Sequence, residues 1–323
     1  MLSISCNGFD KEIKTSMQNP GYVNWQELLK TSVTFPCLPK ISSGYKPKRI
    51  SSNDLSKVVL ALQCTDLTTL AGDDTYSNVS RLCYMAVNPV KENLNNTLGF
   101  EHKLKVAAVC VYPAMVKYAV SSLQKFHAVD IKIAAVATGF PTGQYGLSSK
   151  LDEIRFAVAH GANEIDIVLS RELVLTHNWQ GMYEEVKACR EACGDNVEMK
   201  TILSIGELGS LENIYAASIV ALCAGSDFIK TSTGKEAVNA YLPAGIVMAR
   251  AIKVYYELTG FRAGLKPAGG LRTVEDAVSW INLVEGILGT DWLTPELFRI
   301  GASTLLKNVT KKLETLVKRD RSV

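Results

Sequence analysis

Three charged residues of this sequence lie inside apolar segments that have the length of β-strands. Asp166 lies in the run EIDIV, Lys230 ends the run DFIK, and Lys266 lies near the end of the run AGLKP. Side chains alternate between the two faces of a strand, so Asp166 faces the side opposite to Ile165 and Ile167. A lone charge in an apolar interior is very costly. These residues therefore form either a structural ion pair or a reactive site, and both interpretations stay open here.

The presence of a second lysine favours a reactive site. Two inward-facing lysines with few acids nearby would repel each other, and one of them would then be neutral near pH 7. A neutral amine attacks carbonyl carbons, and a neighbouring cation is one way to produce it. The imine that forms is an electron sink, which lets the bond between the α and β carbons of the substrate break or form. The pair Lys230 and Lys266 thus predicts Schiff-base chemistry.

Glycine-rich segments next to these lysines predict a phosphate site. They are Thr233-Gly234-Lys235, Ala268-Gly269-Gly270 and Gly301-Ala302-Ser303-Thr304. Exposed backbone N–H groups at a helix N-terminus bind phosphate readily, and α/β barrels commonly hold phosphate after strands seven and eight. Lys235 and Arg272 would add positive charge. We therefore expect a phosphorylated small molecule as the partner.

A repeated strand–helix unit positions these residues. From about residue 55, apolar runs of strand length alternate with helical patterns. The runs are Val58–Cys64, Val106–Val111, Ile131–Ala137, Glu164–Leu169, Met199–Ser204, Phe228–Ser232, Ala263–Pro267 and Phe298–Gly301. Nearly continuous apolar runs are typical of parallel strands that are covered on both faces. Eight such units predict a (β/α)8 TIM barrel, with an open doubly wound sheet as the alternative.

In a barrel the active site lies at the carboxyl ends of the strands. Asp66 would end the first strand, so it would join Asp166, Lys230 and Lys266 there.

Helix boundaries have signals of their own. Ser149 with Asp152 and Thr273 with Asp276 resemble capping boxes. Glycines are expected to end three helices: Gly161, Gly225 and Gly260.

Composition excludes several classes of protein. The chain of 323 residues is 47% hydrophobic and 21% charged, with a net charge of +3 and interspersed acids and bases. Nucleic-acid proteins instead concentrate basic residues on one surface. The eight cysteines form no C-x-x-C pairs, as expected of reduced thiols in the cytoplasm. The longest uncharged apolar stretch, Asn213–Ser226, is shorter than the ~20 residues of a membrane span. The sequence leaves open whether the protein is a monomer or a homodimer.

Three parts of the chain are predicted to differ in structure. Residues 1–50 are broken up by prolines and form an N-terminal extension over the barrel, helical only at Val23–Thr31. Residues 51–316 form the barrel. Residues 317–323 form a basic C-terminal tail.

Several motifs, in chain order, carry a family resemblance. They are Asp66–Leu70 with Gly72–Thr75, Cys110–Pro113, Gly139–Pro141, Glu164–Val168, Gly206–Leu208, Phe228–Lys235, Lys266–Gly270 and Phe298–Ser303. The runs FIKTSTGK and KPAGG are the most specific of these motifs. On these residues the chain resembles the deoxyribose-phosphate aldolase family, and the N-terminal extension is more typical of its eukaryotic branch.

The resemblance implies a reaction and residue roles. Members reversibly cleave 2-deoxy-D-ribose 5-phosphate into D-glyceraldehyde 3-phosphate and acetaldehyde, with neither metal nor organic cofactor, in deoxyribose phosphate catabolism. Lys230 would form the imine. Lys266 would favour the neutral form of Lys230 and take part in a proton relay. Asp166 would act as acid and base with Lys266 and a water, and Asp66 would have a positioning role.

Other positions either match or depart from the family pattern. Cys110 and Thr231 would lie near the substrate, although Cys110 is equally well explained as a small buried residue. Ile205 replaces a common threonine and Leu265 a common phenylalanine. The chain ends RDRSV and lacks the C-terminal tyrosine of some bacterial members, which puts the rate in question more than the reaction.

Three rival functions have different sequence requirements. A metal-dependent aldolase would need clustered histidines and carboxylates, whereas the four histidines are scattered at 102, 127, 160 and 177. A transaldolase-like enzyme would share the lysine and the phosphate site but act on another sugar phosphate. A catalytically silent, phosphometabolite-binding barrel would lack Lys230, Lys266 or Asp166, and all three are present.

Overall fold

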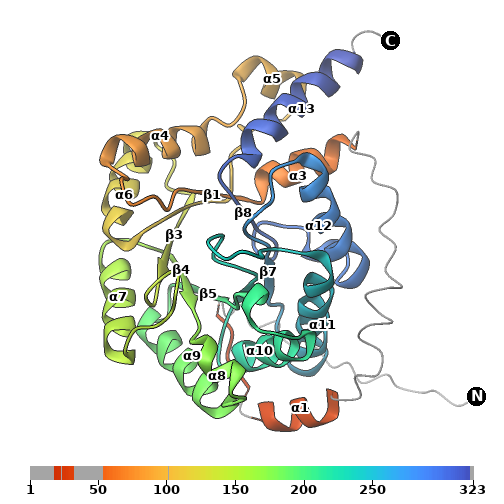
Figure 1. Cartoon of the computed structure of the whole chain (residues 1–323). Coiled ribbons are helices and arrows are strands. Elements are labelled where there is room, and N and C mark those ends of the chain that lie inside the picture. Colours follow the sequence, from red (N-terminus) through yellow and green to blue (C-terminus); the bar gives the residue numbers. More distant parts are fainter. Residues whose placement is uncertain (1–17, 23, 33–53, 101, 321–323) are drawn as a thin grey trace, which may run out of the picture.

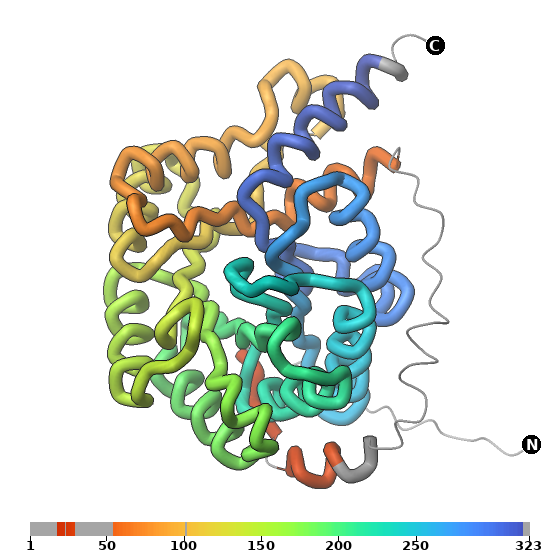
Figure 2. Tube along the Cα trace, in the orientation of Figure 1, coloured from red at the N-terminus to blue at the C-terminus, as the bar shows by residue number. Residues whose placement is uncertain are grey.

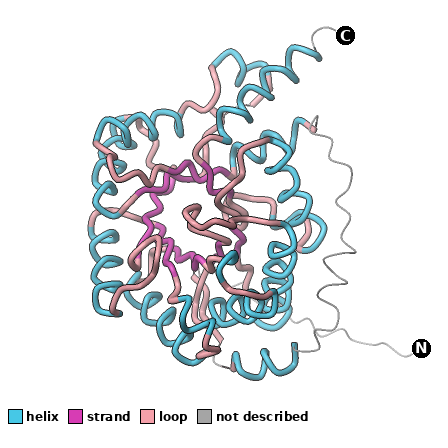
Figure 3. Tube along the Cα trace, in the orientation of Figure 1, coloured by secondary structure: helices cyan, strands magenta, loops and turns pink. Residues whose placement is uncertain are grey.

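Eight parallel strands form the centre of the molecule, and helices surround them (Figures 1 and 3). The structure is a computed structural model that describes residues 18–22, 24–32, 54–100 and 102–320. The strands are β1 (Thr65–Thr68), β2 (Ala108–Val111), β3 (Lys132–Ala137), β4 (Glu164–Val168), β5 (Glu198–Ile202), β6 (Phe228–Lys230), β7 (Gly264–Lys266) and β8 (Ile300–Ala302).

The sheet closes into a barrel, as the sequence predicted. The strands follow the order β7-β6-β5-β4-β3-β2-β1-β8. Parallel bridges at Leu265–Phe298 and Ala268–Gly301 connect the two edge strands. Backbone hydrogen bonds from Leu265 to Leu297 (3.0 Å) and from Gly301 to Pro267 (2.9 Å) complete the closure.

Helices follow the strands and cover the outside of the barrel (Figure 1). The α-helices are α1 (Trp25–Ser32), α3 (Leu55–Gln63), α4 (Tyr76–Val87), α5 (Glu92–Thr97), α6 (Val116–Lys125), α7 (Leu147–Ala159), α8 (Arg171–Leu175), α9 (Trp179–Cys193), α10 (Leu211–Cys223), α11 (Leu242–Thr259), α12 (Val274–Ile287) and α13 (Leu305–Asp320). Short 3-10 helices lie at η1 (Pro113–Met115), η2 (Ile205–Glu207) and η3 (Thr290–Trp292). No described helix is long and apolar enough to cross a membrane.

The first predicted strand is wrong, because residues 55–63 form helix α3 and the strand begins at Thr65. Periodicity cannot distinguish a buried helix from a buried strand in a continuous apolar run. This helix is buried on most sides and packs against α12 and α13. The overlooked signal was Asp54, whose side chain accepts hydrogen bonds from the N–H groups of Ser56 and Lys57 as an N-cap. Asp66 consequently lies within β1 instead of ending it.

One of the two predicted capping boxes is confirmed. Thr273 and Asp276 exchange side chain–backbone hydrogen bonds at the start of α12. The one at Ser149 and Asp152 is wrong, because α7 begins at Leu147 and already includes both residues. The three glycines predicted to end helices all have a positive φ, as expected of this position: Gly161, Gly225 and Gly260.

Among the described N-terminal residues, helix α1 packs against α10 on the outside of the molecule, at the bottom of the view in Figure 2. Helix α1 begins at Trp25, whose ring stacks on Tyr183 of α9 with a centroid distance of 6.0 Å. The predicted helix at 23–31 is therefore confirmed from residue 25 onward, and Val23 lies outside the described residues. At the other end, α13 runs to Asp320 and includes the first residues of the predicted tail.

Candidate active site

Two lysines share one carboxylate oxygen at the carboxyl ends of β6 and β7. Lys230 and Lys266 are direct neighbours in the register of these strands. The Nζ atoms of Lys230 and Lys266 both donate to Oδ2 of Asp166, at 2.8 and 2.7 Å. Lys266 also forms an ion pair with Asp66, with its Nζ 2.5 Å from Oδ2. The structure thus brings together the four residues that the sequence placed at strand ends.

Three further charged residues lie below them, towards the amino ends of the strands. Arg299, which precedes β8, donates to Asp66 Oδ1 (2.8 Å) and to Glu164 Oε1 (2.7 Å). Lys200 of β5 donates to Glu164 Oε2 (2.5 Å), and its Nζ is 3.4 Å from Asp166 Oδ1. The expectation that few acids would lie near the lysines is wrong. Three carboxylates are present there, because Asp66 and Glu164 face the same interior as Asp166.

Sequence reasoning overlooked Lys200 and Arg299, and it did not assign Glu164 to the site. The same alternation argument that turned Asp166 inward applies to Lys200, the middle residue of the strand EMKTI. Arg299 had no comparable signal, since it lies just before a strand of only three residues.

The buried charges hold each other in their ionised forms. Burial would raise the pKa of Asp66, but Lys266 and Arg299 lower it to about 2. Burial likewise opposes ionisation of Asp166, yet Lys230 and Lys266 bring its pKa well below the usual value. For Lys266, burial favours the neutral amine, but Asp166 and Asp66 outweigh it and raise the pKa. Lys266 therefore keeps its proton.

Lys230 is the most accessible of the three lysines. Its side chain is 4% exposed, whereas those of Lys200 and Lys266 are fully buried. Cys110 of β2 is also fully buried, and it lies in a small apolar cluster of the barrel interior with Val136 and Val168. Burial raises the pKa of the Cys110 thiol, which leaves it neutral.

The glycine-rich segments lie at the carboxyl ends of β6, β7 and β8. Gly269 and Gly270 have φ values of +83° and +84°, a conformation that L side chains resist. A Cβ at Gly301 would lie 3.3 Å from Cε of Lys266 and 2.9 Å from Cβ of Ala268. Glycine at this position thus leaves room for Ala268 and for the end of the Lys266 side chain. The hydroxyl of Thr231 exchanges hydrogen bonds with the backbone of Ala268 (2.9 and 3.2 Å).

The polar residues predicted to bind phosphate are accessible. Arg272, Ser303 and Thr304 are exposed, the last two immediately before α13. Lys235 is exposed and reaches across to the carbonyl of Leu70 at 3.1 Å. A cavity of about 610 Å³ lies beside Lys235, lined by the loops that follow β3, β4, β5 and β6.

A carboxylate already contacts one of the predicted phosphate donors. The backbone N–H groups of Thr233 and Gly234 donate to Glu236 at 3.0 and 3.1 Å, and the Thr233 hydroxyl donates at 2.6 Å. Burial raises the pKa of Glu236, but the hydrogen bonds from the hydroxyl and the backbone of Thr233, together with weaker ones, lower it below its usual value. This turn therefore binds an anion with its backbone, as a phosphate would require.

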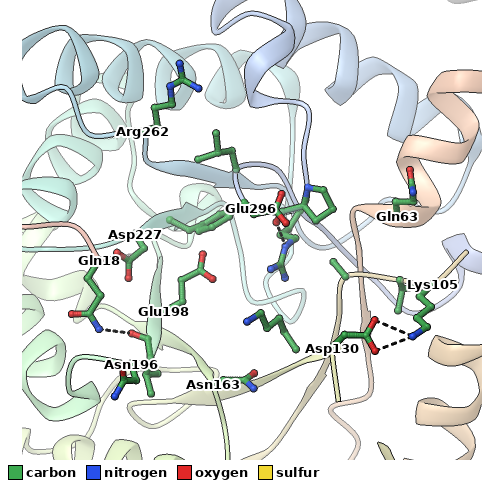
Figure 4. Close-up of a pocket in the computed structure, with 18 of the residues that line it drawn as sticks. Gln18, Gln63, Lys105, Asp130, Asn163, Asn196, Glu198, Asp227, Arg262 and Glu296 are labelled. Atoms are coloured by element: carbon green, nitrogen blue, oxygen red, sulfur yellow. Dashed lines mark hydrogen bonds and ion pairs between the residues drawn. The ribbon is translucent and has the colours of Figure 1, made fainter. Parts of the chain in front are cut away.

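A second cavity, of about 1480 Å³, lies at the amino ends of the strands (Figure 4). Glu198, at the start of β5, lines it together with Asn163 and Asp227. Burial and the nearby Glu164 raise the pKa of Glu198 to about 7. The buried charge cluster thus lies between this cavity and the carboxyl ends of the strands.

Because the carboxylates of the site are paired with cationic side chains, few ligand atoms remain for a metal ion. Among the residues that the structure describes, no three His, Cys, Asp or Glu side chains are arranged to hold one. The buried carboxylates of the site contact lysine and arginine instead. Carboxylates that are paired with lysine and arginine can transfer protons and stabilise cations.

The comparisons with known proteins agree with this geometry. The family model of DeoC/LacD aldolases matches residues 60–311. Deoxyribose-phosphate aldolase of Homo sapiens is 53% identical over 287 residues, covering 88% of this chain and 90% of the relative. The Bos taurus enzyme is 54% identical over 254 residues, covering 78% and 79%.

A solved structure resembles the chain as well. A crystal structure from Coccidioides immitis, which carries the deoxyribose-phosphate aldolase name provisionally, aligns with a TM-score of 0.67 at 26% identity. The alignment covers 89% of this chain and 96% of the other. The fold, the buried lysine pair and the match over most of the sequence lead to one assignment. The chain belongs to the DeoC/LacD family of aldolases.

Proposed function

We propose that this protein is a class I aldolase that reversibly cleaves 2-deoxy-D-ribose 5-phosphate into D-glyceraldehyde 3-phosphate and acetaldehyde. The names of the relatives at 53–54% identity support the substrate. The observation that carries the mechanism is the pair Lys230 and Lys266 on a single oxygen of Asp166. Such a pair provides both an amine that can become neutral and a group that can transfer protons.

In the proposed reaction, Nζ of Lys230 attacks the C1 aldehyde of the open-chain sugar, and loss of water yields the protonated imine. Asp166, acting with Lys266 and a water, removes the proton of the C3 hydroxyl. The C2–C3 bond then breaks, and its electron pair moves into the imine to form an enamine. Glyceraldehyde 3-phosphate leaves. A proton returns to C2, and water releases acetaldehyde and regenerates the lysine.

The surrounding residues receive roles that fit their positions. Asp66 orients Lys266, which it contacts at 2.5 Å. Cys110 and Thr231 border the sugar. The phosphate binds at the carboxyl ends of β6, β7 and β8, where its proposed contacts are Gly234, Lys235, Gly269, Gly270, Arg272, Gly301, Ser303 and Thr304. Lys230 is then within reach of the other end of the sugar phosphate.

Trapping with borohydride tests this proposal. Borohydride reduces an imine to a stable amine, so the protein incubated with 2-deoxyribose 5-phosphate should gain a label on Lys230. Peptide mapping by mass spectrometry locates the label, and Lys230→Ala should remain unlabelled. A label on Lys266 would keep the reaction and exchange the roles of the two lysines. A protein that takes no label, or takes it only from another sugar phosphate, would contradict the proposal.

Two further proposals concern the protein in the cell. We infer that it acts in the cytoplasm, in deoxyribose phosphate catabolism. The six cysteines within the described part of the chain are all free and buried, as expected in a reducing compartment. The homodimer stays a prediction, and light scattering after size-exclusion chromatography would distinguish it from a monomer.

A further inference from the structure

The charged residues beneath Lys230 form a closed ring. Around it anions alternate with cations: Asp66, Arg299, Glu164, Lys200, Asp166 and Lys266. Within the ring, each carboxylate contacts two cations and each cation contacts two carboxylates. The six side chains are at most 3% exposed. With three negative and three positive charges, the ring has no net charge.

Lys230 is attached to this ring but is not a member of it. Among the residues that the structure describes, its Nζ contacts only Asp166, on the same oxygen that Lys266 uses. A protonated Lys230 therefore adds one positive charge for which the ring has no carboxylate left. A buried cluster with an unmatched charge is costly, so the cluster favours loss of one proton. Lys266 pairs with two carboxylates, Asp66 and Asp166, whereas Lys230 shares one of these with it, so Lys230 is the lysine that the ring leaves without a carboxylate of its own.

We propose that Glu164, Lys200 and Arg299 are positioning residues that keep the ring neutral and so make Lys230 the nucleophile. This inference rests on the proposed imine at Lys230. None of the three residues contacts Lys230 in the structure, and they act on it through Asp166 and Lys266. Their proposed role is to set the net charge of the ring, in addition to holding its shape.

The other groups around Lys230 do not change this count. From β2, Cys110 faces the interior as a neutral thiol, because burial raises its pKa. From β3, the interior residues are Ala134 and Val136, which carry no charge. Below the ring, burial raises the pKa of Glu198 to about 7, so its charge changes near neutral pH. The experiments below therefore include Glu198→Gln.

The charge count predicts opposite effects for opposite substitutions. Lys200→Met leaves the ring with one excess negative charge, which a protonated Lys230 would balance. Labelling of Lys230 should then require a higher pH. Glu164→Gln leaves one excess positive charge, so labelling should begin at a lower pH. Interactions between charges at these distances correspond to shifts of about one to two pH units.

The experiment measures the rate of borohydride-trapped labelling of Lys230 by acetaldehyde as a function of pH, using the full chain. The midpoint should rise in Lys200→Met, fall in Glu164→Gln, and return near the wild-type value in the double variant. Arg299→Gln removes a cation from the opposite side of the ring, so its midpoint should rise as in Lys200→Met. Repeating the series in a Glu198→Gln background removes the overlapping ionisation.

A purely structural ring would give a different result. Its substitutions would lower the labelling rate at every pH, and the double variant would be worse than either single one. Midpoints that stay fixed, or that all move in the same direction, overturn the inference while labelling of the wild type leaves the proposed function intact. Absence of any label on wild-type Lys230 contradicts the proposed function itself. If a cation variant does not fold, as judged by circular dichroism, the sign of the Glu164→Gln shift decides.

Discussion

At the scale of single residues, Asp166 has the largest number of roles. Its carboxylate binds Lys230 and Lys266 through one oxygen and lies 3.4 Å from Lys200 through the other. In the proposed reaction it also accepts the proton of the substrate hydroxyl. A carboxylate with a strongly lowered pKa is a weak base in the resting protein. The basicity of Asp166 should increase once Lys230 has formed an imine, because Lys230 then no longer donates the same hydrogen bond to the carboxylate.

The first prediction concerns this residue. Asp166→Asn keeps the shape of the side chain but removes its charge and its ability to accept a proton. We expect kcat for acetaldehyde release to fall about 10²- to 10⁴-fold, the usual contribution of general acid–base catalysis. Asp152→Asn is the matched control, because Asp152 is 75% exposed and pairs only with Arg155 on the surface of α7. Equal activity of the two variants would contradict the role of Asp166.

The second prediction concerns Glu198 and pH. Its pKa is raised by burial and Glu164 to about 7 in the folded protein, whereas an unfolded glutamate has a pKa of about 4.3. Between these values the folded state binds more protons than the unfolded state. The free energy of unfolding must therefore fall as pH rises through this window, and it stays low above it. Each unit of pKa difference corresponds to about 1.4 kcal/mol.

Glu198→Gln cannot lose a proton, so the variant should gain stability relative to the wild type between about pH 5 and about pH 8. Urea denaturation at the two pH values measures this difference. Glu172→Gln, at an exposed position of α8, is the control and should show no such trend. A gain for Glu198→Gln that is equal at both pH values would mean that Glu198 is already ionised at the lower one.

At the scale of elements, the short strand β8 determines how closely the barrel can close around the lysines. Gly301 lies in this strand and pairs with Asp66 of β1. Its missing side chain leaves room for Lys266 and Ala268 of the neighbouring segment. The strand therefore combines closure of the barrel with correct placement of the second lysine.

The third prediction is that Gly301→Ala impairs catalysis. The new Cβ would lie 2.9 Å from Cβ of Ala268 and 3.3 Å from Cε of Lys266, so Ala268 must shift and the end of the Lys266 side chain must move by a few tenths of an ångström. Misplacement of a catalytic group by about 1 Å can cost about 10²-fold in rate, so we expect a smaller loss in kcat here, of about 10-fold or less. Gly72→Ala is the matched control, since its Cβ would have no heavy atom within 4 Å. Full activity of Gly301→Ala would show that Lys266 tolerates displacement.

At the scale of the whole molecule, a residue of the N-terminal segment ties distant parts of the barrel together. Asn19 donates to the carbonyls of Leu222 and Ser226 (2.8 and 2.7 Å), and its backbone N–H donates to Asp227 (2.7 Å). The hydroxyl of Tyr255 donates to its side-chain oxygen at 2.7 Å. These bonds join the N-terminal segment to α10, to the residues just before β6 and to α11, so this part of the predicted extension contributes to the stability of the barrel.

The fourth prediction follows from these bonds. Asn19→Ala leaves buried hydrogen-bonding groups on Tyr255, Leu222 and Ser226 without their partner. The free energy of unfolding should fall by about 1–3 kcal/mol, the usual cost of leaving a buried polar group unsatisfied. The activity of the folded protein should not change, because Asn19 makes no contact with the charged ring. Gln26→Ala, exposed on α1, is the control in the same denaturation experiment. Equal stability of both variants would mean that water replaces the lost bonds.

The sequence by itself determined the features that depend on local patterns. Alternation in apolar runs turned Asp166 and Lys230 inward, and repeated strand–helix units predicted the barrel. Glycine-rich segments marked the carboxyl ends of β6, β7 and β8. The same local reasoning failed at residues 58–64, because a helix buried by α12 and α13 has the continuous apolar pattern of a buried strand.

The tertiary structure alone decided which charges meet. Arg299 and Asp66 are 233 positions apart, and Arg299 and Glu164 are 135 apart. They come together because β8 returns to β1 when the barrel closes. Asn19 likewise finds its partners about two hundred residues away. Periodicity shows which face a side chain occupies, but only closure of the barrel determines which side chains it faces. The neutral ring beneath Lys230 is a property of that closure.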